Sequence, residues 1–184
     1  MLNLPNLITI ARILLVPVMV WAIASHALGI AFVLFVVAGL SDAVDGFLAK
    51  RFGMTSELGA YLDPLADKVL IVSIYVSLGI IEAIPRWLVI LVVSRDLLIV
   101  GGIMLSMILG NPMKVRPLMV SKLNTVAQIV FAAVVLAALG FRFDGETARM
   151  AMTLLMGAVT LLTLLSIGFY LQEWVRHMSV TAQD

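Results

Sequence analysis

Six long apolar segments, separated by short polar turns, dominate the pattern of hydrophobic and polar positions along the chain. A helix that crosses a bilayer needs about 20 predominantly apolar residues, and each segment is of that length. No segment alternates apolar and polar residues as a strand of a membrane barrel would. The pattern therefore predicts six transmembrane helices, at residues 5–25, 28–52, 58–81, 85–110, 118–140 and 147–171.

The composition agrees with a membrane environment. Of the 184 residues, 62% are hydrophobic and 12% are charged, whereas soluble domains carry about 25% charged residues. A soluble fold of this size could not hide so much apolar surface from water. We therefore expect one all-α integral membrane domain over residues 1–184. No basic residue precedes the first apolar segment and Arg12 lies inside it, so we expect a retained helix and not a cleaved signal peptide.

Charge and residue types narrow the function. The formal net charge of +1 argues against nucleic-acid binding, which requires clustered basic residues. The absence of cysteine excludes disulfides and zinc–thiolate sites. Lysine and arginine are more frequent on one side of the predicted bundle, and the positive-inside rule then places both termini in the cytoplasm, with the bacterial inner membrane as the expected location. The basic residues of that side are Lys50, Arg51, Lys114, Arg116, Lys122 and Arg176.

Four aspartates interrupt the apolar pattern. Asp42 and Asp45 are spaced i,i+3, and Asp63 and Asp67 are spaced i,i+4, so each pair lies on one helical face. A carboxylate at the membrane centre costs about 2.5–3.5 kcal/mol on insertion scales, which favours a functional role. Carboxylates are ligands of Mg²⁺, and paired metal ions stabilise displacement at phosphorus. The spacing predicts a metal-dependent phosphoryl-transfer site, in a polar cavity near the cytoplasmic ends of the second and third helices.

Two other interpretations of the acids stay open. The aspartates could form buried ion pairs with Lys50, Arg51 or Lys68. They could also form the ion path of a cation-coupled transporter.

The acids belong to a longer pattern that includes small residues: Asp42-x-x-Asp45-Gly46-x-x-Ala49-Lys50, followed by Gly59-x-x-x-Asp63-x-x-x-Asp67. This pattern resembles the signature of the CDP-alcohol phosphatidyltransferases, which are six-helix, usually dimeric membrane enzymes. They displace CMP from a CDP-linked lipid with an alcohol acceptor. The chain departs from the signature at Lys50, where the family prefers arginine. Lysine keeps the charge but loses the planar fork that grips phosphate.

The resemblance implies a role for each matching residue. Two ions, Mg²⁺ or Mn²⁺, would be held by Asp42, Asp45, Asp63 and Asp67. Alternatively, Asp67 would be the general base that takes the proton of the acceptor hydroxyl. The nucleotide and donor lipid would be bound by Asn6, Thr9, Arg12, Gly46, Ala49, Lys50 and Gly59.

Polar residues inside the fourth and fifth predicted helices are candidates for the acceptor site. Arg95 and Asp96 lie mid-span, and they either form an ion pair or leave Arg95 to face the acceptor. Arg116 and Lys122 form a basic entry to the fifth helix. We expect Arg95, Arg116 and Lys122 to bind the acceptor. A polar stripe with helical spacing predicts a face that lines a cavity: Ser121, Asn124, Thr125 and Gln128. Three aromatic residues are expected at the membrane–water interface: Trp87, Tyr170 and Trp174.

The identity of the acceptor is the remaining choice. Residues 3–9 look like the start shared by phosphatidylglycerophosphate synthases and CMP-forming cardiolipin synthases, while residues 94–98 and 121–125 resemble the cardiolipin synthases more closely. A single lysine at position 122 suits a phosphodiester better than glycerol 3-phosphate, which carries about two negative charges. We predict a homodimeric enzyme that transfers a phosphatidyl group from CDP-diacylglycerol to phosphatidylglycerol, giving cardiolipin and CMP. Glycerol 3-phosphate is the alternative acceptor.

Overall fold

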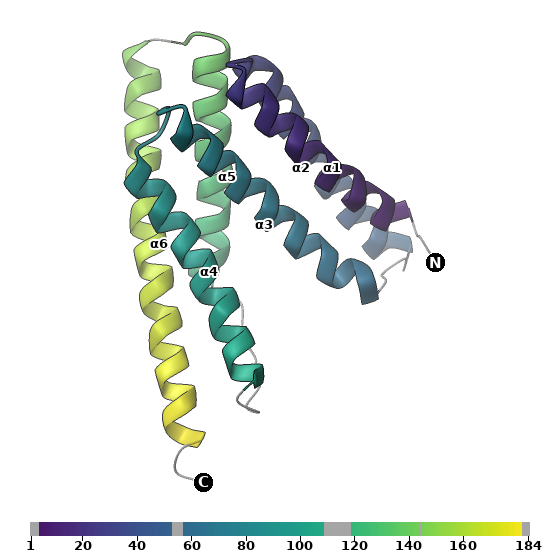
Figure 1. The fold of residues 1–184 in the computed structure, drawn as a ribbon, viewed down its shortest axis with the longest axis vertical. Helices are drawn as coiled ribbons and strands as arrows, with labels where there is room; N and C mark the ends of the chain where they lie inside the picture. Colours follow the sequence, from purple (N-terminus) through teal and green to yellow (C-terminus); the bar gives the residue numbers. More distant parts are fainter. Residues whose placement is uncertain (1–3, 53–56, 109–118, 144, 182–184) are drawn as a thin grey trace.

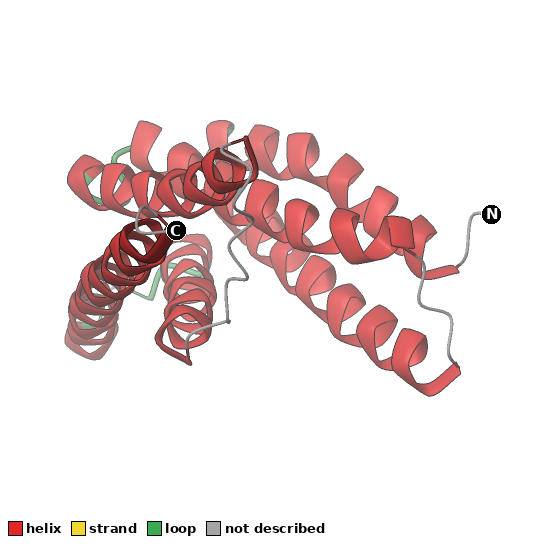
Figure 2. Cartoon of the chain, turned by 90° about the horizontal axis from the view of Figure 1, so that it is seen from below, coloured by secondary structure: helices red, strands yellow, loops and turns green. Residues whose placement is uncertain are grey.

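The computed structural model describes residues 4–52, 57–108, 119–143 and 145–181, and every regular element within these ranges is an α-helix (Figure 1, Figure 2). The prediction of an all-α chain is confirmed for this part of the sequence. The helices are α1 (Leu4–Ala24), α2 (Leu28–Phe52), α3 (Glu57–Ile80), α4 (Arg86–Ile108), α5 (Met119–Gly140) and α6 (Glu146–Thr181).

The predicted bounds are close for the first five helices and wrong for α6. The last helix ends at Thr181, not at residue 171. The prediction stopped at the end of the apolar run, but Gln172, Glu173 and Arg176 have good helix propensity and continue the helix. The length needed to cross a bilayer is therefore only a lower bound on the length of this helix.

The helices form two groups that lean against each other (Figure 1). In the first group α1 packs against α2 and α3, and in the second α6 packs against α4 and α5. The groups are joined because α5 also contacts α2 and α3, and because α3 contacts α4. Successive helices run in opposite directions, so the start of α1 and the end of α6 both lie away from the three tight turns of the described chain.

Those tight turns follow α1, α3 and α5 and share one geometry. Two residues after each helix ends, the backbone is left-handed, at His26, Glu82 and Arg142, with φ of 57°, 60° and 57°. The next amide donates to the carbonyl five residues earlier at 2.8–2.9 Å, which is the Schellman arrangement. A side chain in the left-handed region costs about 1–2 kcal/mol. Packing between the helices that each turn joins must offset this cost.

The buried side chains form a cluster to which all six helices contribute. Its fully buried members are Ile23, Ala31, Tyr75, Leu78, Leu88, Val92, Leu136 and Val159. The close contact between α2 and α5 depends on Gly140, which faces Gly29. A Cβ on Gly140 would lie 2.6 Å from the amide nitrogen of Gly29, so a larger residue at position 140 would push the two helices apart.

Large apolar side chains are exposed on all six helices, for example Leu14, Ile30 and Leu161 at 66%, 59% and 59%. Such an apolar exterior matches lipid and not water. Trp87 is 51% exposed, as expected for an interfacial residue. Tyr170 is 6% exposed, because it packs inside the bundle, where its hydroxyl donates to the carbonyl of Ile99 at 3.1 Å.

By length and composition, two helices of the described chain are sufficient to cross a bilayer: Met119–Gly140 and Glu146–Arg176. Two others contain shorter apolar stretches, Ile8–Ala24 and Leu28–Asp42. Charged residues interrupt the apolar sequence of α3 and α4 at their centres. The crossing of the membrane by all six helices therefore stays a prediction.

Candidate functional site

Three charged side chains from three helices meet at one point. The Nη1 atom of Arg12 in α1 lies 2.7 Å from Oδ1 of Asp42 in α2 and 2.9 Å from Oδ1 of Asp67 in α3. The Arg12 side chain is 1% exposed, whereas both carboxylates are 44% exposed. A residue predicted to bind the donor and two acids of the signature thus lie together, although 55 residues separate Arg12 from Asp67.

These residues line a cavity of about 390 Å³ between α1, α2, α3 and α5, within the size range of small-molecule sites. Its polar residues are Arg12, Asp42, Asp67 and Thr125, and they lie nearer the end of α2 and the starts of α3 and α5 than the apolar lining residues of those helices do. The other lining residues are apolar: Phe35, Val36, Ala38, Gly39, Leu40, Leu70, Ile71, Ile129 and Ala133. One polar end and a long apolar wall suit a ligand with a charged group on a hydrocarbon chain.

The donor atoms at the polar end fit a hard divalent cation. Asp42 and Asp67 each place a carboxylate oxygen close to the same nitrogen atom of Arg12, at 2.7 and 2.9 Å, so both acids lie at one point of the cavity. Carboxylate oxygens are the ligands that Mg²⁺ takes in proteins. Among the residues whose side chains are described, no third acid or histidine joins these two.

Several predicted site residues have side chains that lie outside the described part of the structure. The structure does not describe the side chains of Asn6, Asp45, Gly46, Ala49, Lys50, Gly59 and Asp63, and Arg116 lies outside the described residues. The backbone of α2 and α3 includes both acid pairs. Thr9 is fully buried one turn before Arg12. Lys122 lies exposed in the first turn of α5.

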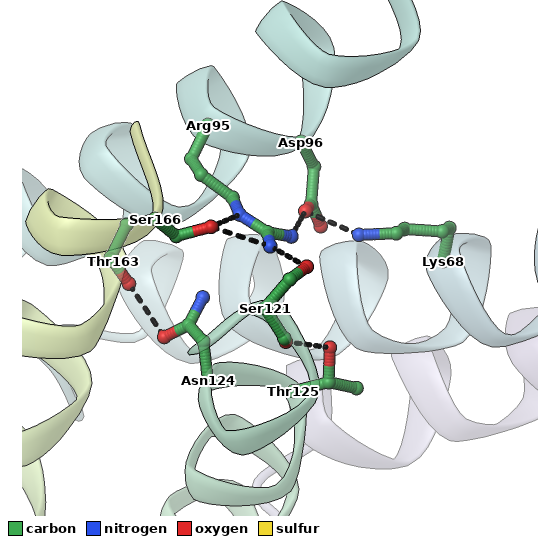
Figure 3. A network of polar contacts seen from close by, with 8 residues as sticks. All are labelled: Lys68, Arg95, Asp96, Ser121, Asn124, Thr125, Thr163 and Ser166. Carbon is green, nitrogen blue, oxygen red and sulfur yellow. Dashed lines mark hydrogen bonds and ion pairs between the residues drawn. The ribbon is translucent and has the colours of Figure 1, made fainter. Parts of the chain in front are cut away.

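A second polar cluster joins α3, α4, α5 and α6 (Figure 3). Arg95, 1% exposed, donates from Nη1 to Oδ1 of Asp96 at 2.6 Å and from Nε and Nη2 to the hydroxyl of Ser166 at 3.1 and 2.8 Å. Its Nη2 also donates to Ser121, and Lys68 pairs with Asp96 from the other side. Two cations therefore share one carboxylate, and the cluster carries one net positive charge.

This cluster contains the predicted ion pair of Arg95 and adds residues that the pattern did not indicate. The ion pair with Asp96 is present, and it extends to Lys68, a cation considered as a partner for the signature acids. Arg95 also lines an apolar cavity of about 530 Å³ between α4 and α6. Thr163 and Ser166 of α6 were not among the predicted site residues. Their i,i+3 spacing within an apolar run was the available signal.

The predicted polar face of α5 lines the first cavity only in part. Thr125 faces that cavity, whereas Ser121 accepts a hydrogen bond from Arg95. Asn124 accepts one from Thr163 at 3.0 Å, and Gln128 is buried. Residues spaced three or four apart lie near each other but not at one angle, so the stripe is divided among the cavity, Arg95 of α4 and Thr163 of α6.

Comparison with known proteins shows the family of the chain. The family model for CDP-alcohol phosphatidyltransferase matches residues 2–165. The chain belongs to this family. The resemblance inferred from the acid signature is thereby confirmed.

Relatives of the chain carry the names of two different enzymes. The chain is 41% identical over 152 residues to a chloroplastic CDP-diacylglycerol–glycerol-3-phosphate 3-phosphatidyltransferase of Oryza sativa, covering 73% of this chain and 46% of the relative. It is 34% identical over 157 residues to a CMP-forming cardiolipin synthase of Homo sapiens, covering 77% and 52%. The corresponding values for a glycerol-3-phosphate enzyme of Bacillus subtilis are 33% over 152 residues, 74% and 77%. The chain spans about half the length of the rice and human relatives.

Proposed function

We propose that the chain is a metal-dependent membrane enzyme that transfers the phosphatidyl group of CDP-diacylglycerol to phosphatidylglycerol, producing cardiolipin and CMP. The observation that carries this proposal is the meeting of Arg12, Asp42 and Asp67 at the polar end of an otherwise apolar cavity. The proposal includes six membrane-spanning helices, a homodimer, and both termini on the cytoplasmic side of a bacterial inner membrane.

The polar end and the apolar wall of the cavity assign an orientation to the donor lipid. Its hydrocarbon lies along the apolar wall between α2 and α5, and its pyrophosphate lies at the polar end, beside Arg12. An arginine binds phosphate oxygens with a planar pair of N–H groups. Thr9 precedes Arg12 by one turn on α1. We assign the cytidine to these residues together with Asn6, Gly46, Ala49, Lys50 and Gly59.

The acids hold the metal and move the proton. Asp42 and Asp67, with Asp45 and Asp63, supply the carboxylate oxygens for two ions, Mg²⁺ or Mn²⁺. Bound metal supplies positive charge that neutralises the pyrophosphate. Asp67 accepts the proton of the acceptor hydroxyl while the hydroxyl oxygen forms a bond to the phosphorus of the phosphatidyl group. The bond from that phosphorus to the CMP oxygen breaks, and CMP leaves with the bonding electrons.

The acceptor is assigned from the charges near α4 and α5. The cluster of Arg95, Asp96 and Lys68 has one net positive charge, and Lys122 lies exposed at the start of α5. One phosphodiester carries a single negative charge, so phosphatidylglycerol requires less positive charge than glycerol 3-phosphate. We assign Arg95, Arg116 and Lys122 to the acceptor. Glycerol 3-phosphate is the second candidate, because the rice and Bacillus relatives are named for it.

The test is CMP release by the purified protein in detergent micelles. CDP-diacylglycerol is supplied with phosphatidylglycerol or with glycerol 3-phosphate, in parallel, with Mg²⁺, with Mn²⁺ and with a chelator. We expect metal-dependent CMP release with phosphatidylglycerol, and cardiolipin as the lipid product. Release only with glycerol 3-phosphate reassigns the acceptor. No release with either acceptor refutes the transferase, and ion transport by sealed vesicles without any CDP-lipid supports a transporter instead.

A pair of glycine variants tests the position of the donor. Gly39 lines the cavity, and a Cβ at this residue meets no atom within 4 Å. Gly39→Phe should therefore fill the cavity without a clash at Cβ and raise the KM for CDP-diacylglycerol. Gly168 in α6 is equally open but does not line this cavity, so Gly168→Phe is the matched control. Equal KM values for the two variants would place the donor elsewhere.

A further inference from the structure

One nitrogen atom of Arg12 contacts both signature acids that the structure describes. The distances of 2.7 and 2.9 Å are those of charge-assisted hydrogen bonds. Carboxylate oxygens are also the ligands that a divalent cation takes. Arg12 and a metal ion therefore compete for Asp42 and Asp67.

Arg12 and the two carboxylates differ in their exposure to water. Arg12 is 1% exposed, so protein groups and not water must compensate its charge. Asp42 and Asp67 are 44% exposed, and water can compensate part of theirs. A guanidinium keeps its charge in proteins, so a metal ion at these oxygens would lie beside a buried cation. Arg12 then opposes metal binding, unless another anion replaces the two carboxylates as the partner of Arg12.

A pyrophosphate group is such an anion. Arg12 lines the same cavity as Asp42 and Asp67, so a CDP-linked ligand in this cavity brings phosphate oxygens to the guanidinium. Phosphate accepts two parallel N–H bonds from arginine and carries more negative charge than one carboxylate. Both changes favour transfer of Arg12 from the acids to the phosphate.

We propose that Arg12 couples donor binding to metal binding. Without a CDP group in the cavity, Arg12 competes with the metal for Asp42 and Asp67. A CDP group draws Arg12 away and makes both carboxylates available, so metal is bound tightly only when the donor is present. This proposal rests on the proposed function. By linkage, the factor by which the CDP group tightens metal binding equals the factor by which metal tightens binding of the CDP group.

The opposite role for Arg12 would be a scaffold that holds the two acids in position for the metal. The two roles predict opposite signs for removal of the charge. If Arg12 competes, Arg12→Gln tightens metal binding in the absence of nucleotide. If Arg12 is a scaffold, the same variant separates the acids and weakens metal binding.

The experiment titrates the purified protein in detergent with Mn²⁺ and follows free Mn²⁺ by electron paramagnetic resonance, with and without CDP. The titration is corrected for the Mn²⁺–CDP complex in solution. For Arg12→Gln without CDP we expect a Kd for Mn²⁺ about tenfold lower than that of the wild type, within the usual range of coupling. Arg12→Lys keeps the charge and should stay close to the wild type. Arg86→Gln, which removes an exposed cation of α4, is the control for net charge.

The response to CDP gives a second measurement that needs no variant. CDP should tighten Mn²⁺ binding by the wild type, and Mn²⁺ should tighten CDP binding by the same factor. In Arg12→Gln the effect of CDP on Mn²⁺ should be smaller. An unchanged or raised Kd for Mn²⁺ in Arg12→Gln, or no effect of CDP on the wild type, overturns the proposal. Neither measurement needs turnover, so a failure of the transferase assay stays distinguishable from a failure of this coupling.

Discussion

The stability of this bundle should depend strongly on the negative charge of Asp96. Its Oδ1 atom pairs with both Arg95 and Lys68, and its side chain is 7% exposed. Asp96→Asn keeps the size and shape of the side chain but removes the only negative charge of the cluster. Arg95, which is 1% exposed, then stays buried beside Lys68 with no carboxylate between them.

The structure sets the magnitude. Removal of one partner from a buried ion pair costs about 3–5 kcal/mol. Lys68 is 37% exposed, and water compensates part of its charge, so we expect a loss near the lower end, about 3 kcal/mol in the free energy of unfolding. The control is Glu82→Gln, because Glu82 and Arg86 form an i,i+4 pair with side chains 72% and 75% exposed. That variant should lose about 0.5 kcal/mol or less.

The assay is unfolding in detergent micelles, by heat or by SDS, followed by circular dichroism. The double variant Asp96→Asn with Lys68→Met removes one of the two uncompensated cations, so it should be more stable than Asp96→Asn alone. The reasoning is refuted if Asp96→Asn and Glu82→Gln lose the same free energy. It is also refuted if the free-energy loss of the double variant equals the sum of the losses of Asp96→Asn and Lys68→Met. Additive losses would mean that Asp96 and Lys68 do not interact.

Three further predictions concern the site and its surroundings. Asp67→Asn should lower turnover by about 100-fold or more, as for loss of a general base, and should also weaken Mn²⁺ binding, because Asp67 is one of the assigned ligands; turnover restored by saturating Mn²⁺ would make Asp67 mainly a ligand. Lys122→Ala should raise the KM for the acceptor about tenfold, as for loss of one charge-assisted hydrogen bond, and an equal rise for CDP-diacylglycerol would contradict the assignment. Thr163→Val leaves Asn124 without its donor and should destabilise the bundle by about 0.6–1.7 kcal/mol. Thr160→Val, whose hydroxyl bonds within its own helix, should lose less in the same unfolding assay.

Much of the architecture follows from local pattern. Each apolar run was long enough to specify a helix, and the predicted ends of α1 to α5 lie within two residues of the observed ends. The end of α6 was missed because helix propensity, and not apolarity, decides how far a helix continues past the bilayer. The acid signature indicated the family through its resemblance to a known pattern, which requires no knowledge of contacts between helices.

Pairing between helices was harder to predict. Lys68 had several possible partners, and it pairs with Asp96, 28 residues away. Arg95 contacts Ser166 across 71 residues, although nothing in the local sequence of α6 indicated which residue its hydroxyl would meet. The polar residues of α5 were expected to line one cavity, yet their side chains divide between that cavity and α6.

The sequence by itself determined the helices, their apolar exterior and the face on which each acid lies, because all three depend on hydrophobicity and on the 3.6-residue period of one helix. Only the tertiary structure decided that Arg12 contacts Asp42 and Asp67 through a single nitrogen atom. That contact depends on how three helices are rotated against one another. Packing among side chains far apart in the sequence sets this rotation, and no local pattern contains it.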